Sequence, residues 1–358
     1  MLRTKTKPQP LISVCIPVFD TEPFLEQCLR SVITQDFEEF EVVVVSDASR
    51  GRNGRGWSAK KIVKRVSKES RALRKSLGLA MVPLRFIEHS ENRGLVEARR
   101  TLVYEARGKY ILQCDSDDVL EEGALKSLWS AATTVVESVE TSIDIVHGTS
   151  TAGYFDSENQ FTPAKQNRYG QIHYGPLEGH EIFRRWLIGG EFTSNSWGKL
   201  IKKEIFVQAF ENIPYTQCNM AEDVLIFFFI SQFAKSYIGI EDKVCRYRID
   251  SGMSSARKID TTRKWRMVCS AASVFTILSE WIKAHPADFG EDEVAEIKKK
   301  TAFYLANNLK QMKETVAPEL QNQALEILKE YWGESFVEKM LPSVIQPVTQ
   351  TSPQNAGC

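Results

Sequence analysis

Along its first 150 residues, the chain alternates short apolar runs with longer segments whose apolar residues recur at helical spacing. The apolar runs are typical of strands buried on both faces of a sheet. They cover residues 11–19, 41–45, 83–88, 109–114 and 143–147. Helical segments follow the first three runs, the first capped by Thr21 and the next two beginning near Ser58 and Gly94. This alternation predicts βαβ units and an α/β fold with a mainly parallel sheet flanked by helices.

The pattern changes near residue 260. Segments 261–284, 292–313 and 318–331 show helical spacing with few strand signals, which predicts an α-helical C-terminal region. Residues 342–358 are rich in Pro, Gln, Ser and Thr, a composition typical of a disordered tail. Residues 1–9 are expected to form a flexible N-terminus.

Composition narrows the class of protein. The 358 residues include 46 Lys and Arg against 46 Asp and Glu, and this zero net charge argues against a dedicated nucleic-acid binder. The seven cysteines form no CxxC pair, so neither a disulfide framework nor a zinc knuckle is expected. The N-terminus lacks a long apolar run, and the most apolar stretch, residues 224–230, is far shorter than the roughly 20 residues of a membrane helix. The composition therefore predicts a cytoplasmic protein.

Carboxylates follow two of the predicted strands. Asp47 ends the second strand, and the run Asp115-Ser-Asp-Asp118 follows the fourth. Ligands of a parallel sheet bind at the carboxyl edge of its strands, where these residues are expected to gather. Three acids within four positions repel one another unless a cation neutralises them, and oxygen ligands suit Mg²⁺ or Mn²⁺. A solvated turn with helix-capping aspartates is the alternative interpretation.

Two further features point to chemistry at this edge. A predicted helix begins near Gly94 and carries Arg99, and both a helix N-terminus and a guanidinium favour an anionic ligand. Glu222 and Asp223 precede an apolar helical segment. A carboxylate pair in that position is either a helix cap or a source of the general base for a hydroxyl nucleophile.

Six motifs, taken in order, resemble the motif series of family 2 glycosyltransferases with the GT-A fold. They are ISVCIPVFD (12–20), VVVVSDAS (42–49), ENRGLVEARR (91–100), GKYILQCDSDDVL (108–120), SWGKLIKKEIF (196–206) and AEDVLIFF (221–228). The resemblance implies a GT-A, Rossmann-like α/β domain over residues 10–255, followed by a helical C-terminal region over 256–341. It also implies an inverting transfer of a sugar from a nucleotide-diphosphate sugar, with UDP the expected nucleotide. The expected acceptor is a hydroxyl of a glycan or lipid-linked glycan in polysaccharide, lipopolysaccharide or glycoconjugate synthesis.

The resemblance also implies roles for single residues. Asp223 would be the catalytic base, and Asp115 and Asp117 would hold a divalent cation, Mn²⁺ or Mg²⁺. Asp47 would face the nucleotide base. The residues that would contact the nucleotide sugar are Pro17, Phe19, Asp47, Arg99, Asp115 and Ser116. The residues that would line the sugar or acceptor region are Trp197, Lys199, Glu222 and Arg248.

The chain departs from the family pattern at two strand ends. Phe19-Asp20 stands where the family often has Tyr-Asn, and Ser46-Asp47-Ala48-Ser49 replaces the usual Asp-Asp-Gly-Ser. Neither change removes the metal pair or the base. Both changes leave the identity of the nucleotide open.

Residues 50–75 are strongly basic, with Glu69 as their single acid. The basic residues are Arg50, Arg52, Arg55, Lys60, Lys61, Lys64, Arg65, Lys68, Arg71, Arg74 and Lys75. One interpretation is a solvated helix face. The other is a patch that touches anionic lipid or a lipid-linked acceptor, which would place the protein peripherally on the inner face of the cell membrane.

Two other functions compete with glycosyl transfer. A phosphotransferase of the haloacid dehalogenase type also has a DxD motif at a strand end, although normally at the strand nearest the N-terminus. A non-catalytic scaffold that binds a sugar nucleotide would keep the binding residues but show no turnover. The oligomeric state stays open.

Overall fold

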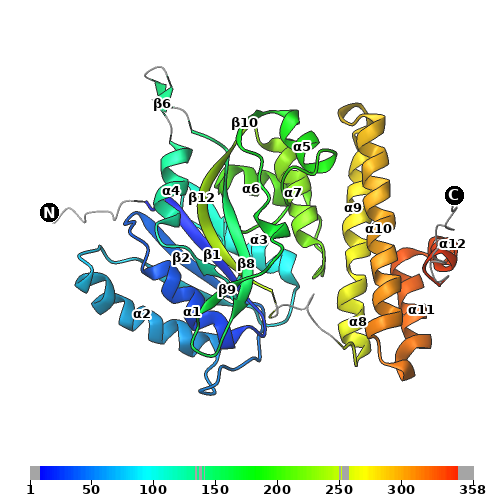
Figure 1. Ribbon diagram of the computed structural model, residues 1–358, viewed down its shortest axis with the longest axis horizontal. Coiled ribbons are helices and arrows are strands. Elements are labelled where there is room, and N and C mark those ends of the chain that lie inside the picture. Colours follow the sequence, from blue (N-terminus) through cyan, green and yellow to red (C-terminus); the bar gives the residue numbers. More distant parts are fainter. Residues whose placement is uncertain are drawn as a thin grey trace, which may run out of the picture.

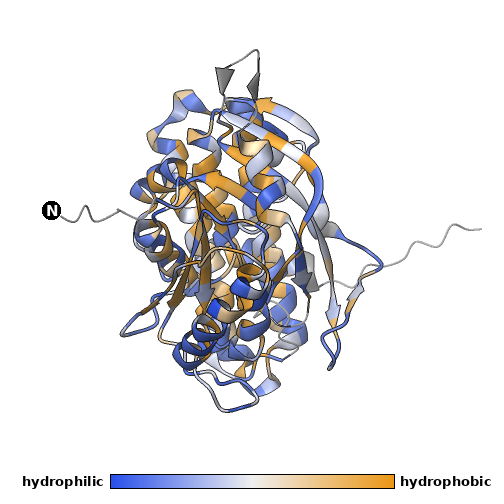
Figure 2. Ribbon diagram, turned by 90° about the vertical axis from the view of Figure 1, so that its left-hand side faces the viewer, coloured by the Kyte–Doolittle hydropathy of each residue, from blue (hydrophilic) through white to orange (hydrophobic). Residues whose placement is uncertain are grey.

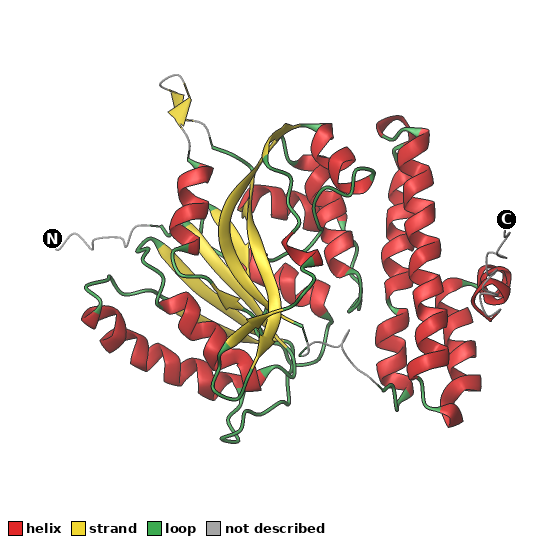
Figure 3. Ribbon diagram, in the orientation of Figure 1, coloured by secondary structure: helices red, strands yellow, loops and turns green. Residues whose placement is uncertain are grey.

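The computed structural model describes residues 9–133, 135–136, 139–140, 142–249, 251 and 258–345. An α/β part built around one large sheet lies beside a block of long helices (Figure 1). Every described strand belongs to the first part, and the helical block follows it in the chain (Figure 3). The predicted fold class, a sheet-based α/β structure with a helical C-terminal region, is confirmed.

Four strands in parallel register form one half of the sheet. Their order is β3–β2–β1–β4. They are β1 (Ile12–Val18), β2 (Phe40–Ser46), β3 (Leu84–Glu88) and β4 (Tyr110–Gln113). Because β2, β1 and β4 are adjacent and parallel, the residues that follow them meet at one edge of the sheet, as the sequence predicted.

The other half of the sheet mixes strand directions. The strand β11 (Lys199–Lys202) runs antiparallel to both β4 and β8 (Ile145–Phe155), whereas β8 runs parallel to β12 (Ser236–Arg248). The remaining strands are β10 (Gly175–Glu178) at the edge, β5 (Val119–Leu120) beside β12, β9 (Phe161–Pro163) beside β8, and the separate pair β6 (Val135–Val136) and β7 (Val139–Glu140). The sequence predicted only the start of β8, because β8 and β12 interrupt their apolar residues with glycines and charges.

Helices cover both faces of the sheet, and the alternation of side chains along each strand decides which core a residue joins. In β1, Val14 and Ile16 belong to one core and Cys15 to the other. The first core includes α1 (Glu22–Ile33), α2 (Ala59–Ser76) and α4 (Ala124–Ala132). The second includes α3 (Leu95–Glu105), α5 (His180–Leu187), α6 (Lys203–Asn212) and α7 (Glu222–Phe233). In Figure 2 the apolar strands lie between helices that carry both hydrophobic and hydrophilic residues.

The second core continues into the C-terminal helices. They are α8 (Thr262–Cys269), α9 (Ala271–Ala284), α10 (Glu291–Thr315), α11 (Gln321–Trp332) and α12 (Glu334–Ile345), with 3-10 turns η3 (Pro286–Asp288) and η4 (Pro318–Leu320). Phe229 of α7 meets Trp281 of α9 edge to face, with ring centroids 5.0 Å apart, and Phe228 stacks on Phe289 at 5.8 Å. Such aromatic pairs contribute about 0.5–1.5 kcal/mol beyond their burial. The helical region therefore shares a core with the sheet-based part.

Two local predictions were wrong. Thr21 is the N-cap residue of α1, but its hydroxyl makes no capping hydrogen bond and instead lies 2.6 Å from Ser116 Oγ. The helix α12 continues to Ile345, so residues 342–345 are helical and do not belong to the predicted tail. Its apolar residues Phe336 and Met340 pack on the core, which stabilises the helix beyond the point where composition changes. The predicted N-terminal residues 1–8 and tail residues 346–358 lie outside the described residues.

One described helical stretch is long and apolar enough to cross a membrane. It is Thr262–Ala284, with mean hydropathy 1.2, and 44% of its most apolar window is buried inside the protein. Its apolar residues are spread among polar ones, so it forms no continuous apolar run like residues 224–230. Trp265, Phe275 and Leu278 of this stretch pack in the second core. Length and composition alone do not separate a core helix from a membrane span.

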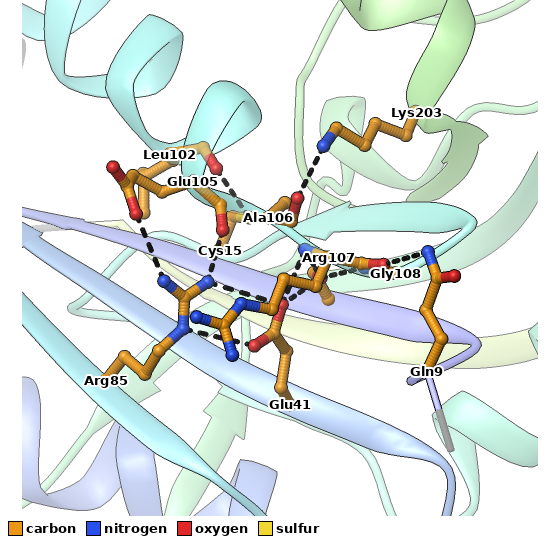
Figure 4. Close-up of polar contacts among 11 residues, drawn as sticks. Gln9, Cys15, Glu41, Arg85, Leu102, Glu105, Ala106, Arg107, Gly108 and Lys203 are labelled. Carbon is orange, nitrogen blue, oxygen red and sulfur yellow. Dashed lines mark hydrogen bonds and ion pairs between the residues drawn. The ribbon is translucent and has the colours of Figure 1, made fainter. Parts of the chain in front are cut away.

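A polar cluster closes the amino edge of the sheet (Figure 4). Glu41 of β2 is buried, and its Oε1 accepts hydrogen bonds from Ser13 Oγ at 2.8 Å and from the Arg107 backbone N–H at 2.7 Å. Arg85 of β3 donates through Nε to Glu41 Oε2 at 3.2 Å and pairs with Glu105 at 3.1 Å. The cluster joins β1, β2, β3 and the end of α3, and its buried charge has partners on both oxygens.

Candidate functional site

A cavity of about 420 Å³ opens at the carboxyl edge of the sheet. Its wall is built from the ends of β1, β2 and β4 and from the starts of α3 and α7. The predicted site residues that it brings together are Pro17, Phe19, Asp47, Arg99, Asp115, Ser116, Asp117, Trp197, Glu222 and Asp223. Its volume lies within the range of cavities that enclose small ligands.

Asp47 accepts four hydrogen bonds. Its Oδ1 accepts from His89 Nδ1 at 2.7 Å and from the Arg93 N–H at 2.9 Å. Its Oδ2 accepts from Asn92 Nδ2 and from the Gly94 N–H, both at 2.9 Å. Gly94 has φ +91°, a backbone conformation that favours glycine. The carboxylate therefore fixes the end of β2 to the loop that begins α3.

The aspartates after β4 carry more negative charge than their neighbours neutralise. Asp117 Oδ2 accepts a hydrogen bond from Ser251 Oγ at 2.5 Å. Burial, and then the charge of Asp115, raises the pKa of Asp117. Asp118 is fully buried, and its Oδ2 has no hydrogen-bond partner in the described part of the chain. Burial, followed by the charges of Asp117 and Asp115, raises the pKa of Asp118 well above its usual value.

Arg99 lies beneath the cavity and links its two sides. The side chain is almost fully buried, with Nη2 at 2.8 Å from Asp115 Oδ1 and 3.7 Å from Glu222 Oε1. Burial opposes its charge, but Asp115 and Glu222 keep the pKa of Arg99 above its usual value. The guanidinium therefore couples the end of β4 to the start of α7 electrostatically.

Glu222 and Asp223 form the wall at the start of α7. Burial, and then the charge of Asp223, raises the pKa of Glu222 to about 8, against the opposing effect of Arg99. Burial also raises the pKa of Asp223, although the Val224 N–H, the charge of Arg99 and the Ser194 hydroxyl oppose it. Asp223 Oδ2 accepts a hydrogen bond from Ser194 Oγ at 3.2 Å. The raised pKa of Glu222 favours its protonated form at neutral pH.

Left-handed backbone is concentrated around this site. Of the four described non-glycine residues with positive φ, three flank cavity residues: Asp20 (φ 56°), Ala48 (φ 54°) and Ala221 (φ 61°). Such conformations cost about 1–3 kcal/mol each and persist where the surrounding structure holds them. Ala221 in particular sets the direction from which Glu222 and Asp223 enter the cavity.

Two predicted residues of the acceptor region lie behind the cavity wall. Lys199 is fully buried in β11, where Nζ donates to the Asn195 carbonyl at 2.7 Å and burial lowers the pKa of the amine to about 7. The Arg248 Nε donates to the Asp117 carbonyl at 3.0 Å, and its guanidinium lies 4.1 Å from the centre of the Phe155 ring. In this position each side chain supports a cavity residue from the rear.

Sequence reasoning missed three tyrosines of the wall: Tyr169, Tyr247 and Tyr304. Tyr304 comes from α10, so the helical region contributes directly to the cavity. Burial, and then the charges of Asp223 and Glu222, raises the pKa of the Tyr304 phenol. Tyr247 stands in the segment Arg246-Tyr-Arg248, which resembles a basic segment of the family but gives the tyrosine no role. For Tyr169 and Tyr304, spacing indicates only that a tyrosine belongs to a buried face.

Comparison with known families decides the class of protein. The family described as Glycosyl transferase family 2 matches residues 13–189. The chain carries a family 2 glycosyltransferase domain.

Curated relatives of this glycosyltransferase include glycosyltransferases GlyA and GlyG of Streptococcus pneumoniae serotype 4. GlyA is 27% identical over 259 residues, which make up 71% of this chain and 32% of GlyA. GlyG is 24% identical over 255 residues, or 70% of this chain and 74% of GlyG. The chain thus spans about a third of GlyA and about three quarters of GlyG. Among solved structures, S. aureus TarS 1-349 is similar with a TM-score of 0.47 and 16% identity, covering 93% of this chain and 91% of that one.

The family match covers β1 to α5 of the glycosyltransferase. It contains Asp47, Arg99 and the aspartates after β4, whereas Glu222 and Asp223 lie beyond its end. The sheet with helices on both faces is the GT-A arrangement that the sequence predicted. The family match argues against the haloacid dehalogenase type of phosphotransferase, and a turnover assay distinguishes the scaffold alternative.

The aspartates after β4 of the glycosyltransferase fit a divalent cation. Asp115 and Asp117 could supply oxygen ligands. Burial, and then the charge of Asp115, raises the pKa of Asp117, and Oδ2 of Asp118 has no hydrogen-bond partner among the described residues, so a cation would offset the charge of this run. Within the described ranges, no group of three or more His, Cys, Asp or Glu side chains is arranged to hold a metal. A Mg²⁺ ion at substrate phosphates commonly takes only one or two protein carboxylates, so two aspartates suffice.

Proposed function

We propose that this chain is an inverting glycosyltransferase that moves a sugar from a nucleotide-diphosphate sugar, with UDP as the nucleotide, to a hydroxyl acceptor. The observation that carries the proposal is that two pairs of carboxylates line one cavity. Asp115 and Asp117 follow β4, and Glu222 and Asp223 begin α7. The first pair suits a diphosphate with its cation, and the second suits a hydroxyl group that must lose a proton.

The nucleotide is proposed to lie against the ends of β1 and β2. Pro17 and Phe19 line this part of the cavity, and Phe19 offers a ring on which a base can stack. Asp47 lines it as well, but its carboxylate already accepts four hydrogen bonds. We therefore expect Asp47 to have two roles. It holds the loop that begins α3 in the position that shapes the nucleotide end of the cavity, and it contacts the base.

The diphosphate is proposed to lie at the aspartates after β4. Asp115 and Asp117 would hold Mn²⁺ or Mg²⁺, which when bound supplies Lewis-acid stabilisation of the diphosphate leaving group. Arg99 keeps Asp115 ionised and oriented through the 2.8 Å ion pair. Ser116 is held by its contact with Thr21, so the turn that presents the two aspartates is anchored to the start of α1.

Asp223 is proposed to act as the base. As the acceptor oxygen attacks the anomeric carbon, Asp223 takes the hydroxyl proton, and the bond from the anomeric carbon to the diphosphate oxygen breaks. The attack occurs on the face opposite the leaving group, so the anomeric configuration inverts. Ser194 donates to Oδ2 of Asp223 and orients it, and the raised pKa of Glu222 favours protonation of that neighbour at neutral pH.

Thermal unfolding in the presence of nucleotides tests the donor assignment. UDP, GDP, ADP and CDP are each added with Mn²⁺, with Mg²⁺ and with EDTA. A ligand at a hundredfold excess over its Kd stabilises by about 2.7 kcal/mol, so we expect UDP to raise Tm only when metal is present. Asp117→Asn should lose this shift, whereas Asp36→Asn, at an exposed aspartate, should keep it. Equal shifts for all nucleotides, or a shift that survives EDTA, would contradict the assignment.

The acceptor is proposed to be a glycan or lipid-linked glycan in surface polysaccharide, lipopolysaccharide or glycoconjugate synthesis, on the cytoplasmic side of the cell membrane. The support for membrane contact is the outer face of α2. Its exposed basic residues are Lys60, Lys61, Lys64, Arg65, Lys68, Arg71 and Lys75. Such a row attracts anionic lipid with about 1 kcal/mol for each cation near the surface. Salt-sensitive co-sedimentation with anionic vesicles is expected, and binding that is equal on neutral vesicles would argue against the contact.

A further inference from the structure

Three aromatic rings form a series on one wall of the cavity. Tyr247 of β12 stacks on Trp197, with ring centroids 4.9 Å apart and planes at 19°. Tyr169, in the 3-10 turn η1 (Arg168–Gly170), packs against Tyr247 with centroids 4.6 Å apart. Trp197 is 6% exposed, whereas Tyr169 is 39% exposed. The series therefore begins in the core and ends in one open ring, on the wall that also carries Asp117 and Asp223.

The turn that carries Tyr169 is docked on β8 at both ends. Asn167 Nδ2 donates to the Ser150 carbonyl at 2.6 Å, and Asn167 Oδ1 accepts from the Ala152 N–H at 3.2 Å. After the tyrosine, a Cβ on Gly170 would lie only 2.3 Å from the Ser150 carbonyl oxygen, so this close approach requires glycine. The ring is thus held in place before a ligand arrives, which lowers the entropy cost of binding.

The order of the strands separates these rings from the nucleotide end. Across the sheet the order is β12–β8–β11–β4–β1–β2. The aspartate run follows β4, and Asp47 follows β2 on one side of it. Tyr247 belongs to β12, and Trp197 precedes β11, both on the other side. The aspartates after β4 therefore lie between a ligand bound on these rings and the proposed position of the nucleotide.

We propose that Tyr169, supported by Tyr247 and Trp197, binds a pyranose ring of a carbohydrate acceptor by stacking. One face of a pyranose ring presents mainly C–H bonds, which carry slight positive charge and pack well on the negative face of an aromatic ring. The proposal rests on the proposed glycosyl transfer. It narrows the acceptor to a glycoside whose terminal sugar offers such a face, and it makes Tyr169 a specificity-determining residue.

The first experiment asks whether the rings instead hold the nucleobase, since every base also has a face that stacks on aromatic side chains. Calorimetry measures UDP binding in Mn²⁺ to the wild type, Tyr169→Ala and Tyr169→Phe. We expect the three Kd values to agree within about twofold. A UDP affinity that falls fivefold or more in Tyr169→Ala would assign the rings to the base and overturn the proposal. If UDP fails to bind the wild type, the proposed donor is wrong, and that result is read separately from the next measurement.

The second experiment measures the sugar directly. Saturation-transfer NMR is recorded with methyl β-D-glucopyranoside, methyl β-D-galactopyranoside and methyl N-acetyl-β-D-glucosaminide. At least one glycoside should receive saturation at its ring C–H protons. Its affinity should fall about 2- to 10-fold in Tyr169→Ala and persist in Tyr169→Phe, because the ring and not the hydroxyl makes the contact. Tyr174→Ala, at an exposed tyrosine five residues further on, is the matched control. No signal in the wild type, or an unchanged affinity in Tyr169→Ala, overturns the proposal.

Discussion

The two edges of the sheet treat buried carboxylates in opposite ways. At the amino edge, Glu41 has donors on both oxygens: Ser13 and Arg107 on one, and Arg85 on the other (Figure 4). At the carboxyl edge, Glu222 lies 3.7 Å from Nη2 of Arg99, and burial raises the pKa of this acid to about 8. The Glu41 side chain is 2% exposed, whereas the Glu222 side chain is 14% exposed on the cavity wall.

The number of donors around each carboxylate indicates whether it serves stability or catalysis. A buried charge with a full set of donors ties strands together and has no capacity left for a ligand. A buried carboxylate with too few donors costs stability, and it holds a proton or a cation until a ligand supplies the missing partners. Glu41 should therefore matter for folding, whereas Asp223 and its neighbours should matter for turnover. The predictions below test this division, beginning with the largest effect.

Replacing Asp223 by Asn should have the largest effect on activity. The amide keeps the shape of the side chain but cannot take a proton from the acceptor. General-base catalysis contributes about 10²–10⁴-fold, so kcat should fall by that factor while Tm stays at or above the wild-type value. UDP release from UDP-sugars with an acceptor, followed beside a thermal unfolding curve, measures both. Full activity in a folded Asp223→Asn protein would falsify the assignment of the base.

Replacing Glu41 by Ala should lower stability and leave activity nearly unchanged. The change removes the Glu41 partner of Arg85 and leaves the Ser13 hydroxyl and the Arg107 N–H without their acceptor, which should cost about 3 kcal/mol and lower Tm by about 6 °C. The rate constant per folded molecule should stay within about twofold of the wild type, because the cluster lies at the edge away from the cavity. Glu105→Ala is the matched control, since Glu105 pairs with the same arginine but is half exposed. A larger loss of stability in the control than in Glu41→Ala would contradict the division.

The polar residues at the carboxyl edge of the sheet could be predicted from the sequence, whereas the polar cluster at the amino edge could not. Asp47, Asp115 and Asp117 directly follow buried apolar runs, and parallel strands bring such positions to one edge. Glu41 looked only like the first residue of a strand. Its partners Ser13 and Arg107 come from other elements, and no local pattern specifies which long-range donors a side chain will meet.

The tyrosines of the cavity were missed for a related reason. Tyr247 lies in a strand with mixed polarity, Tyr169 in a short turn, and Tyr304 in a helix of the C-terminal region. Each joins the cavity through packing between elements far apart in the chain. Helical spacing predicted the C-terminal helices themselves, but the side that faces the cavity depends on how α9 and α10 dock on α5 and α7. That docking rests on aromatic contacts such as Phe229 with Trp281, which periodicity does not specify.

The pH dependence of stability should reveal the raised pKa of Glu222. In the folded protein the pKa of Glu222 is about 8, whereas an unfolded glutamate has a value near 4.5. Between these values the folded state holds a proton that the unfolded state has lost, so stability falls as pH rises from about 4.5 to about 8. In Glu222→Gln this contribution is absent. We therefore expect the Tm of the wild type, without nucleotide, to fall more steeply than that of Glu222→Gln between pH 5 and pH 8. Parallel curves for the two proteins would show that Glu222 titrates normally.

The smallest expected effect tests whether the helical region takes part in the cavity at the carboxyl edge. Tyr304 lines the cavity from α10, and its hydroxyl has no hydrogen-bond partner among the described residues. A hydroxyl in that position can bind the acceptor or the departing sugar, and a single neutral hydrogen bond contributes about 0.5–1.5 kcal/mol. Tyr304→Phe should therefore lower kcat/KM about 2- to 10-fold with an unchanged Tm, because the ring keeps its packing against Phe275. Phe303→Leu, at the neighbouring residue that is 60% exposed, should change neither value. Wild-type kinetics in Tyr304→Phe would mean that the helical region only covers the core. The functional side chains of the cavity would then all come from the α/β part.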